Sequence, residues 1–239
     1  MTIKLLVMLL KGFLQVPRPR IKNKLSVLPK FKIICEGEKT EPNYINGYIN
    51  RVHSAHKKIF CFSEPGCTDP NGLIRAAIKE RESGVAGDVV WVIYDRESLV
   101  KYSDEVHASA RTLADDNNIQ IAFSNVCFEM WILLHFEYSL ACYTSYDDLK
   151  KRSRLREHVK SLGFDSYEKS EALLFDKLKD NVSDAIKNAT KLRQNMIASA
   201  DKNRSRPFHL NPYTDVDEML QDMENFIENR PSIRAKKQV

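Results

Sequence analysis

The sequence predicts an α/β fold with an open, mainly parallel sheet flanked by helices and a helical C-terminal extension. From Phe31 to about residue 143, apolar runs of strand length alternate with segments of helical period, as in parallel strands joined by crossover helices. Beyond that point the chain is polar and helical. We therefore expect a basic tail at residues 1–29, an α/β domain at 30–143 and the extension at 144–239.

Four apolar segments are the predicted strands. They are FKIIC at 31–35, KIFCFS at 58–63, DVVWVIYD at 88–95 and IQIAFS at 119–124. The third is rich in Val, Ile, Trp and Tyr, so it is apolar on both faces, as a central strand of a parallel sheet is. We expect these segments to form the sheet.

The predicted helices follow the strands. Thr40 and Ser103 are expected to cap two of them, and Asp69-Pro70 opens another. A helix containing FEMWILLHF comes after the fourth strand. The extension holds predicted helices at 146–162, 168–178, 182–200 and 216–227, the last of which follows a turn at NPYT.

Composition limits the class of protein. The 239 residues are 43% hydrophobic and 29% charged, which is enough to bury a full core and excludes a disordered chain. The five cysteines form no CxxC pair and are odd in number, which indicates reduced thiols and a cytoplasmic location. No stretch approaches the roughly 18 apolar residues of a membrane span, and we expect no membrane partner.

Basic residues are unevenly distributed. The net charge is +5, and residues 1–35 carry eight basic side chains and no acidic one. A second basic run, KKRSRLREHVK, covers residues 150–160. Lys151, Arg152 and Arg154 in this run are candidate contacts to a nucleic-acid backbone, because such contacts are mainly electrostatic. The alternative is that both runs are solvated faces.

Carboxylates follow three of the predicted strands. Glu36 comes directly after the first, Asp95 and Glu97 close the third, and Glu129 lies five residues after the fourth. Because ligands of a parallel sheet bind outside its carboxyl edge, these four side chains are expected to converge there. Like charges held this close need protons or cations, and carboxylate oxygens are ligands that Mg²⁺ and Mn²⁺ prefer.

Each of these carboxylates also has an ordinary structural interpretation. Glu36 and Gly37 could form a simple turn, and Asp95 and Glu97 could belong to a surface loop with local ion pairs. Glu129 could favour the positive end of its helix. The combination points to a site, because three segments end at the same predicted edge.

Four blocks of the sequence resemble one protein family. EGEKTEPNY, VVWVIYDRE, FSNVCFEMWILLHFE and NPYTDV occur in that order and are similar to the RloB family, which includes the AbiLii proteins of abortive-infection systems. The resemblance implies a Toprim-like α/β fold, related to the nuclease domain of the OLD family, and a role in defence against phage. It also implies an ABC-type ATPase partner encoded nearby, since this chain has no GxxxxGK[ST] phosphate loop.

The resemblance also implies roles for the candidate residues. Toprim domains carry a glutamate after the first strand and a DxD motif after a later one, which correspond here to Glu36 and to Asp95 and Glu97, with DxE in place of DxD. These three would hold Mg²⁺ or Mn²⁺, with Glu36 as an alternative general base. Glu129 would complete the metal shell or orient Lys39.

Cations near these carboxylates are candidate phosphate contacts. Lys39 and Arg96 could each bind a phosphate oxygen, and the alternative for both is a solvated surface charge. Tyr167, paired with Lys169 near a helix start, is expected to cap the helix or face solvent. Two non-catalytic functions stay open beside the nuclease: a sensor of nucleic acid or nucleotide, and an interaction subunit.

Overall fold

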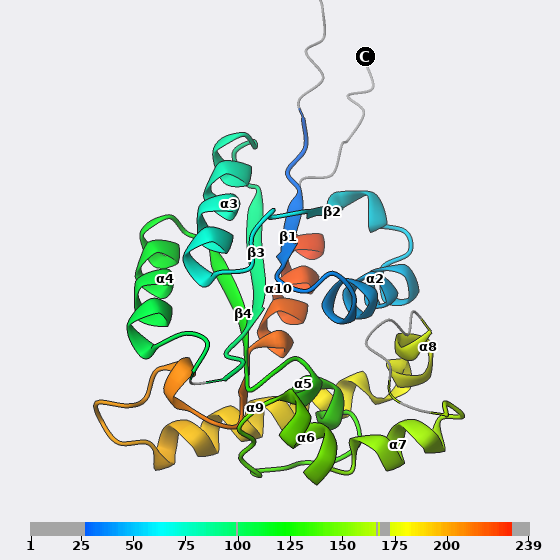
Figure 1. The fold of residues 1–239 in the computed structure, drawn as a ribbon. Helices are drawn as coiled ribbons and strands as arrows, with labels where there is room; N and C mark the ends of the chain where they lie inside the picture. The colour runs from blue at the N-terminus through cyan, green and yellow to red at the C-terminus, as the bar shows by residue number, and fades with distance from the viewer. Residues whose placement is uncertain (1–26, 99, 166, 168–172, 231–239) are drawn as a thin grey trace, which may run out of the picture.

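The computed structural model describes residues 27–98, 100–165, 167 and 173–230. Within this part of the chain, a five-stranded sheet of order β2-β1-β3-β4-β5 has helices on both faces (Figure 1). The parallel strands are β1 (Phe31–Cys35), β2 (Phe60–Ser63), β3 (Val89–Asp95) and β4 (Gln120–Asn125), and β5 (Tyr213–Thr214) is antiparallel to β4. The predicted fold class, an α/β fold with an open, mostly parallel sheet flanked by helices, is confirmed.

The strands form where the apolar runs predict them. β1 has the predicted bounds, and the other three parallel strands lie within two residues of theirs. Val92 and Ile93 of β3 are both fully buried, so both faces of this central strand are covered. Cys35 pairs with Ile93 and Asp95 pairs with Ser124, so β1, β3 and β4 end close to one edge of the sheet.

Different helices cover the two faces. On one side, α3 (Pro70–Glu82) and α4 (Asp104–Asp116) pack their apolar residues, such as Leu73 and Ala110, against β3 and β4. On the other side lie α2 (Thr40–Val52) and α10 (Val216–Asn229), whose Ile45 and Met219 share a core with Phe31 (Figure 1). The sheet is therefore the middle layer of three.

The remaining helices lie beyond the carboxyl ends of the strands (Figure 1). They are α5 (Glu129–Leu134), α6 (Tyr146–Arg152), α7 (Leu155–Ser161), α8 (Leu174–Leu178) and α9 (Val182–Ser199), with short 3₁₀ turns η2 (Lys179–Asn181) and η3 (Pro207–His209), whereas the turn η1 (Lys57–Ile59) directly precedes β2. All six residues of α5 are buried, and α5 packs against α9. These helices close over the edge where the candidate carboxylates were predicted.

Four local predictions need correction or completion. The N-cap of α2 is Lys39, and Thr40 is the first helical residue. The predicted helix 146–162 is divided into α6 and α7 by Ser153, whose extended backbone (ψ 169°) ends α6 and whose hydroxyl accepts a hydrogen bond from Leu155 N–H. NPYT contains β5 as well as a turn. The predicted helix 168–178 lies partly outside the described residues, and α8 is the part within them.

Within the described residues, β5 and α10 are two of the elements that attach the C-terminal half to the sheet. β5 pairs with β4, with Thr214 opposite Ser124, and α10 packs against β4. The predicted boundaries at 29–30 and 143–144 stay predictions, and residues 1–26 of the basic tail lie outside the described part. Within that part, no helix combines the length and apolar character needed to cross a membrane.

Candidate functional site

Glu36 lies directly beyond β1 and faces the end of β3. Its backbone N–H donates to Ile93 O at 2.9 Å, which extends the parallel ladder by one residue. Its Oε2 accepts a hydrogen bond from Asp95 N–H at 3.1 Å. Burial raises the pKa of Glu36, and the hydrogen bond from Asp95 N–H partly opposes this rise. The carboxylate is therefore fixed at the carboxyl edge, as predicted from its place in the sequence.

Asp95 is the most deeply enclosed of the predicted carboxylates of β1 and β3. Its Oδ2 accepts a hydrogen bond from Phe128 N–H at 3.1 Å, whereas its Oδ1 is buried and accepts none from the described residues. Burial raises the pKa of Asp95 well above its usual value, and the charges of Glu41, Glu129 and Glu36 raise it further. Asp95 thus lies among three other carboxylates.

Glu41 belongs to this group and was not predicted from the sequence. It lies in the first turn of α2 and is buried. Its carboxylate packs so closely against Gly37 that a Cβ at that position would collide with it. The signal that could have found Glu41 is its place in the first turn of a helix that starts at the carboxyl edge of the sheet.

Glu129 is the first residue of α5 and is buried beside the same edge. Its Oε1 accepts a hydrogen bond from the Tyr167 hydroxyl at 2.9 Å. The expectation that Tyr167 caps a helix or faces solvent is therefore wrong, because its side chain is buried and bound to Glu129. Lys169, its predicted companion, lies outside the described residues. Lys39, which Glu129 was expected to orient, is exposed at the N-cap of α2.

Glu97 and Lys101 form the solvent-facing side of the site. The backbone of Glu97 is left-handed (φ 55°), a conformation that non-glycine residues seldom adopt and that is frequent at functional sites. Lys101 Nζ lies 2.5 Å from Glu97 Oε2 and 3.6 Å from Glu36 Oε1. Lys101 was not predicted, and its spacing of four residues from Glu97 is the signal that could have found it. A cavity of about 380 Å³ is lined by Glu36, Glu97 and Lys101. Asp95, Glu41 and Lys39 line it as well.

These side chains fit a metal in chemistry but are not arranged as a complete metal site. Carboxylate oxygens suit Mg²⁺ and Mn²⁺, and Asp95 Oδ1 is a buried oxygen without a hydrogen bond from the described residues. However, no three or more His, Cys, Asp or Glu side chains in the described ranges are grouped so that they could hold a metal ion. Instead, the Lys101 ammonium lies between Glu36 and Glu97. The metal roles of Glu36, Asp95 and Glu97 remain predictions.

Arg96 was predicted to contact a phosphate, but its side chain is buried and bound to other parts of the protein. Its side chain is 2% exposed, and its guanidinium donates to Tyr102 O at 2.6 Å and to Asp104 Oδ1 at 2.9 Å. It also lies 3.0 Å from His107 Nε2. A phosphate would have to displace these partners, so we assign Arg96 to the attachment of α4 to the end of β3.

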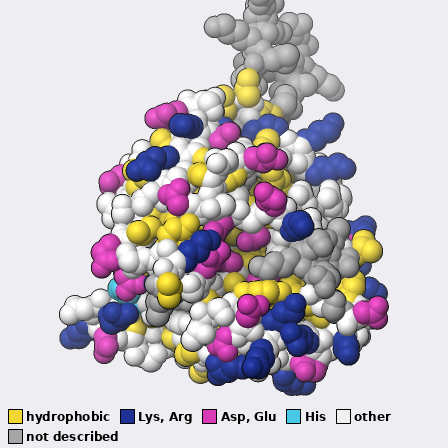
Figure 2. Space-filling view, viewed as in Figure 1, with side chains coloured by type: hydrophobic (Ala, Val, Ile, Leu, Met, Phe, Trp, Pro, Cys, Tyr) yellow, Lys and Arg dark blue, Asp and Glu magenta, His cyan; other side chains and the backbone are white. Residues whose placement is uncertain are grey.

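The basic stretch after residue 150 lies on the surface of α6 and α7. Arg152 pairs with Asp148 at 2.9 Å, Arg154 pairs with Glu137 at 3.3 Å, and Lys151 is exposed. Figure 2 shows Lys and Arg side chains gathered over this lower part of the molecule, below the acidic side chains near its centre. The three predicted residues are therefore accessible, although two of them already have acidic partners.

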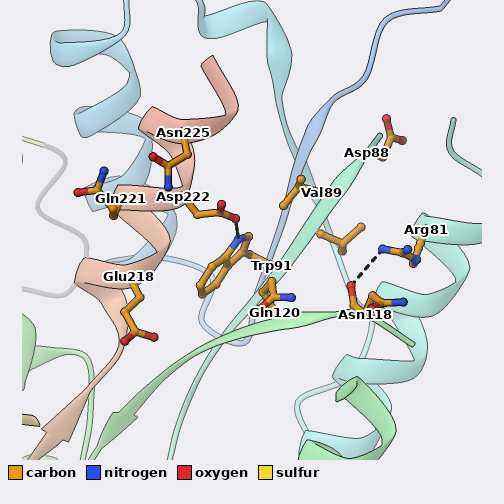
Figure 3. A pocket seen from close by; sticks show the side chains of 11 residues that line it. Arg81, Asp88, Val89, Trp91, Asn118, Gln120, Glu218, Gln221, Asp222 and Asn225 are labelled. Carbon is orange, nitrogen blue, oxygen red and sulfur yellow. Dashed lines mark hydrogen bonds between the residues drawn. The ribbon is translucent and has the colours of Figure 1, made fainter. Parts of the chain in front are cut away.

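A different cavity lies at the opposite edge of the sheet, where β3 and β4 begin. It measures about 570 Å³, and its lining includes Trp91, Gln120 and Asp222 (Figure 3). Trp91 Nε1 donates to Asp222 Oδ2 at 2.8 Å, so the indole is fixed against α10. None of the carboxylates described above lines this cavity. The candidate site is thus at the carboxyl edge, where ligands of parallel sheets bind.

Comparison with protein families identifies the relatives of the chain. A family model described as RloB-like protein matches residues 31–223, a range that includes all five strands and all the carboxylates of the site. The chain belongs to the RloB-like protein family. The resemblance drawn from the four sequence blocks is confirmed. Searches of curated proteins and of solved structures found no significant match.

Proposed function

We propose that this RloB-like protein is a metal-dependent nuclease that hydrolyses phosphodiester bonds of DNA or RNA in anti-phage abortive-infection defence. The observation that carries the proposal is the position of Asp95. Its carboxyl group is buried at the end of β3 beside Glu36, Glu41 and Glu129, and their charges raise its pKa. The defence role rests on membership of the family.

A purely structural explanation of this cluster is weak. Burying several like charges costs folding free energy unless cations or protons compensate them. Lys101 contacts Glu36 and Glu97 at the rim, but Asp95 Oδ1 receives no hydrogen bond from the described residues. Carboxyl groups such as Glu36 and Asp95, whose pKa values are raised by burial at a ligand-binding edge, are typical of active sites.

The side chains have distinct roles in the proposed reaction. Glu36, Asp95 and Glu97 would hold Mg²⁺ or Mn²⁺, which when bound supplies Lewis-acid activation of the phosphate and lowers the pKa of water. Alternatively, Glu36, at the boundary of the cavity and with a raised pKa, would accept a proton from the attacking water instead of holding the metal. Lys39 and Lys101 line the same cavity and can balance the charge of the phosphate.

Cleavage by purified protein tests the proposal. Plasmid, single-stranded DNA and tRNA are incubated with wild type in Mg²⁺, in Mn²⁺ and in EDTA. We expect cleavage with metal, its loss in Asp95→Asn, and a decrease of about 10²–10⁴-fold in Glu36→Gln. Asp184→Asn, an exposed carboxylate on α9, is the matched control and should retain activity. Undiminished cleavage by Asp95→Asn and Glu36→Gln would exclude this site.

A non-catalytic sensor of nucleic acid or nucleotide is the second candidate. The position of Lys101 favours it, because its ammonium balances Glu36 and Glu97 without a metal ion and lines the cavity that would receive the phosphate. This candidate predicts binding without cleavage under every metal condition. Lys101→Ala should then abolish binding, whereas in a metal-dependent nuclease the same substitution leaves metal-dependent binding in place.

We also propose an ABC-type ATPase encoded nearby as the partner, on the basis of the family resemblance. The chain carries no GxxxxGK[ST] motif, so ATP-driven activation would come from the partner. The cleavage assay is therefore repeated with the co-purified ATPase and ATP. Activity that appears with the ATPase and is lost in Asp95→Asn supports both proposals. Failure of the two proteins to co-purify would argue against the partner.

A further inference from the structure

A larger cavity adjoins the carboxylate cavity. It measures about 1000 Å³ and shares Glu36, Gly37, Glu38 and Thr68 with its neighbour. Its remaining walls come from the start of α2, from the end of β2 and from the loop that follows β2. This volume is at the upper end of the roughly 300–1,000 Å³ that small-molecule sites occupy. The β1–α2 loop thus lines both cavities, which lie next to each other.

Both cavities are lined by several carboxylates, but they differ in the cations beside them. Lys39 and Lys101 line the carboxylate cavity. Among the described residues that line the larger cavity, none is Lys or Arg, and of its carboxylates Glu36 and Glu38 also line the first cavity. Among the described lining residues, only those of the first cavity offer a phosphate a cation, so we place the phosphate there. The larger cavity is suited to an uncharged part of a nucleotide.

Phe62 gives the larger cavity an aromatic surface. It lies on β2 two residues after Phe60, so the two rings leave the strand on the same side. Phe60 is 8% exposed in the core, but Phe62 is 37% exposed and lines the cavity. Asn46 and Ser63 provide hydrogen-bonding groups on the same lining. An exposed ring beside polar side chains is the arrangement on which unpaired bases stack.

We propose that the larger cavity binds an unpaired nucleobase, stacked on Phe62, of the nucleotide whose phosphate lies at the carboxylates. The inference rests on the proposed function and specifies its substrate. A base in a duplex is covered by its neighbours and its partner, so it can enter a cavity only when it is unpaired or turned out of the helix. The protein therefore acts on single-stranded or locally unpaired nucleic acid.

A comparison of two probes and several variants tests this inference. Fluorescence anisotropy measures binding of labelled oligothymidylate and of an oligomer of the same length with abasic sites, both in EDTA and in millimolar Mg²⁺. Wild type should bind the thymidylate about 5-fold to 150-fold more tightly than the abasic oligomer. In Phe62→Ala this ratio should fall toward one, and Phe62→Tyr should restore it. Ile197→Ala, an exposed apolar residue of α9, is the matched control and should keep the wild-type ratio.

The outcomes separate this inference from the proposed function. An unchanged ratio in Phe62→Ala, in a protein that cleaves nucleic acid, overturns base binding by the cavity and leaves the nuclease standing. A ratio that collapses in Phe62→Ala supports base binding even where no cleavage is measured. Absence of binding to both oligomers by wild type overturns the base site and counts against a nucleic-acid substrate. Thermal melting confirms that each variant is folded.

Discussion

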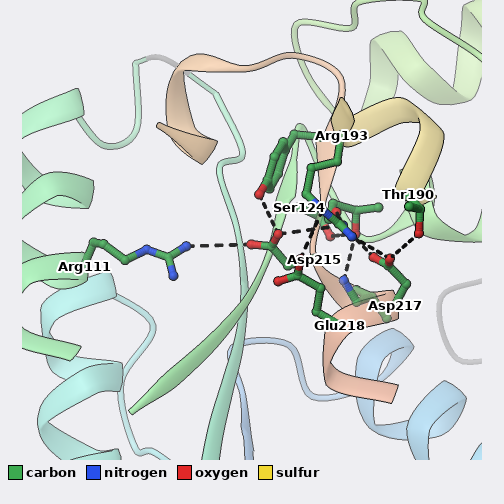
Figure 4. A network of polar contacts seen from close by, with 10 residues as sticks. Arg111, Ser124, Thr190, Arg193, Asp215, Asp217 and Glu218 are labelled. Atoms are coloured by element: carbon green, nitrogen blue, oxygen red, sulfur yellow. Dashed lines mark hydrogen bonds and ion pairs between the residues drawn. The ribbon is translucent and has the colours of Figure 1, made fainter. Parts of the chain in front are cut away.

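Two groups of buried carboxylates lie at strand ends, one after the edge strand β5 and one after the central strand β3, and they differ in the cations that face them. Beside β5, Arg193 contacts both oxygens of Asp217 at 2.8 Å and also reaches Glu218 at 3.2 Å (Figure 4). At the end of β3, Asp95 lies among three other carboxyl groups, and its Oδ1 accepts no hydrogen bond from the described residues. A buried aspartate is thus paired with a cation beside β5, whereas Asp95 at the end of β3 is surrounded by carboxyl groups.

The difference separates a structural network from a candidate site. The contacts of Arg193 join α9 to β5 and α10, since it also donates to Thr214 O at 2.9 Å. The network is explained by its role in holding α9, β5 and α10 together, and this role needs no ligand. The Asp95 cluster also joins elements, since Asp95 accepts a hydrogen bond from Phe128 N–H, but it gathers like charges around Asp95, a cost to stability that is usual where side chains bind ligands. Perturbation of the two regions should therefore have opposite effects on stability.

The largest effect is expected from Arg193→Ala. The Arg193 side chain is 13% exposed and that of Asp217 is 4% exposed, so the substitution leaves a buried carboxylate without its cation. Breaking a buried pair in this way costs about 3–5 kcal/mol. For a chain of this size, that loss should lower the melting temperature by about 6–20 °C, measured by scanning calorimetry.

Two further variants sharpen this test. Arg152→Ala removes an arginine that is 56% exposed and paired with Asp148, and it should change the melting temperature far less. Replacing Arg193 and Asp217 together by Leu should recover much of the stability, because neither member of the pair is then buried without the other. Equal losses in Arg193→Ala and Arg152→Ala would show that the network is not what attaches the C-terminal helices.

The next effect concerns pH and Asp215. Burial raises the pKa of Asp215 in the folded state to about 7, from 3.8 for an ordinary Asp. Because the folded state then binds the proton more tightly, the contribution of this group to stability is complete below about pH 4 and is lost as the pH rises toward 7. The groups that face Asp215 are Tyr213 (Oη at 2.6 Å), Arg111, Arg193 and Glu218.

Asp215→Asn should remove this dependence on pH. Relative to wild type, the variant should gain on the order of 2 kcal/mol in free energy of unfolding between pH 5 and pH 8, because it has no proton to lose. Urea unfolding of both proteins at the two pH values measures the gain. A difference between the proteins that is the same at both pH values would show that Asp215 does not titrate in this range.

The sequence predicted the parallel part of the fold because each strand is a dense apolar run between helical segments. β5 could not be predicted in this way, since two residues are too few to show a period of two. Its pairing with β4 brings Thr214 opposite Ser124, 90 positions earlier in the chain. A contact between segments so far apart is set by packing and leaves no local pattern.

The sequence predicted the carboxylates of the candidate site that follow the ends of strands. Glu36, Asp95 and Glu129 converge because β1, β3 and β4 end at one edge. Glu41 was missed because it reaches that edge from a helical turn. Arg96 was misassigned because adjacent residues of an extended chain point to opposite sides, so the neighbour of Asp95 faces α4 and Asp104.

A smaller effect on stability tests the Asp95 cluster without knowledge of the substrate. In EDTA, Asp95→Asn should melt at the wild-type temperature or higher, because the substitution removes a carboxyl group whose ionisation burial and three neighbouring carboxylates oppose. The amide oxygen can still accept the hydrogen bond from Phe128 N–H. Most substitutions at buried positions destabilise a protein, so this outcome distinguishes the cluster from the Arg193 network.

Metal should reverse the order of the two proteins. A ligand that binds the folded state alone stabilises it by RT ln(1 + [L]/Kd), and Asp95→Asn would lose much of that affinity. Millimolar Mg²⁺ or Mn²⁺ should therefore raise the melting temperature of wild type above that of the variant. If the variant is clearly less stable in EDTA and metal shifts neither protein, Asp95 is a structural residue and the nuclease proposal loses its main physical support.

The smallest effect on stability is expected from the basic surface of α6 and α7. Lys151, Arg152 and Arg154 are exposed, and exposed pairs such as Arg154 with Glu137 contribute about 0–1 kcal/mol. The triple substitution to Ala should therefore leave the melting temperature nearly unchanged. If this surface follows a phosphate backbone, affinity for single-stranded DNA should nevertheless fall, which anisotropy titrations over a range of salt concentrations measure.

The slope of log affinity against log salt decides between a binding surface and a solvated one. Each lost phosphate contact should reduce the slope by about 0.7 for a single strand, so the triple variant should lose up to about 2. The loss should be smaller if Arg152 and Arg154 keep their pairs with Asp148 and Glu137 in the complex. Lys187→Ala on α9 is the matched control, because its side chain is 74% exposed. An unchanged slope in the triple variant would mean that these residues form a solvated face, and that the strand reaches Asp95 by another route.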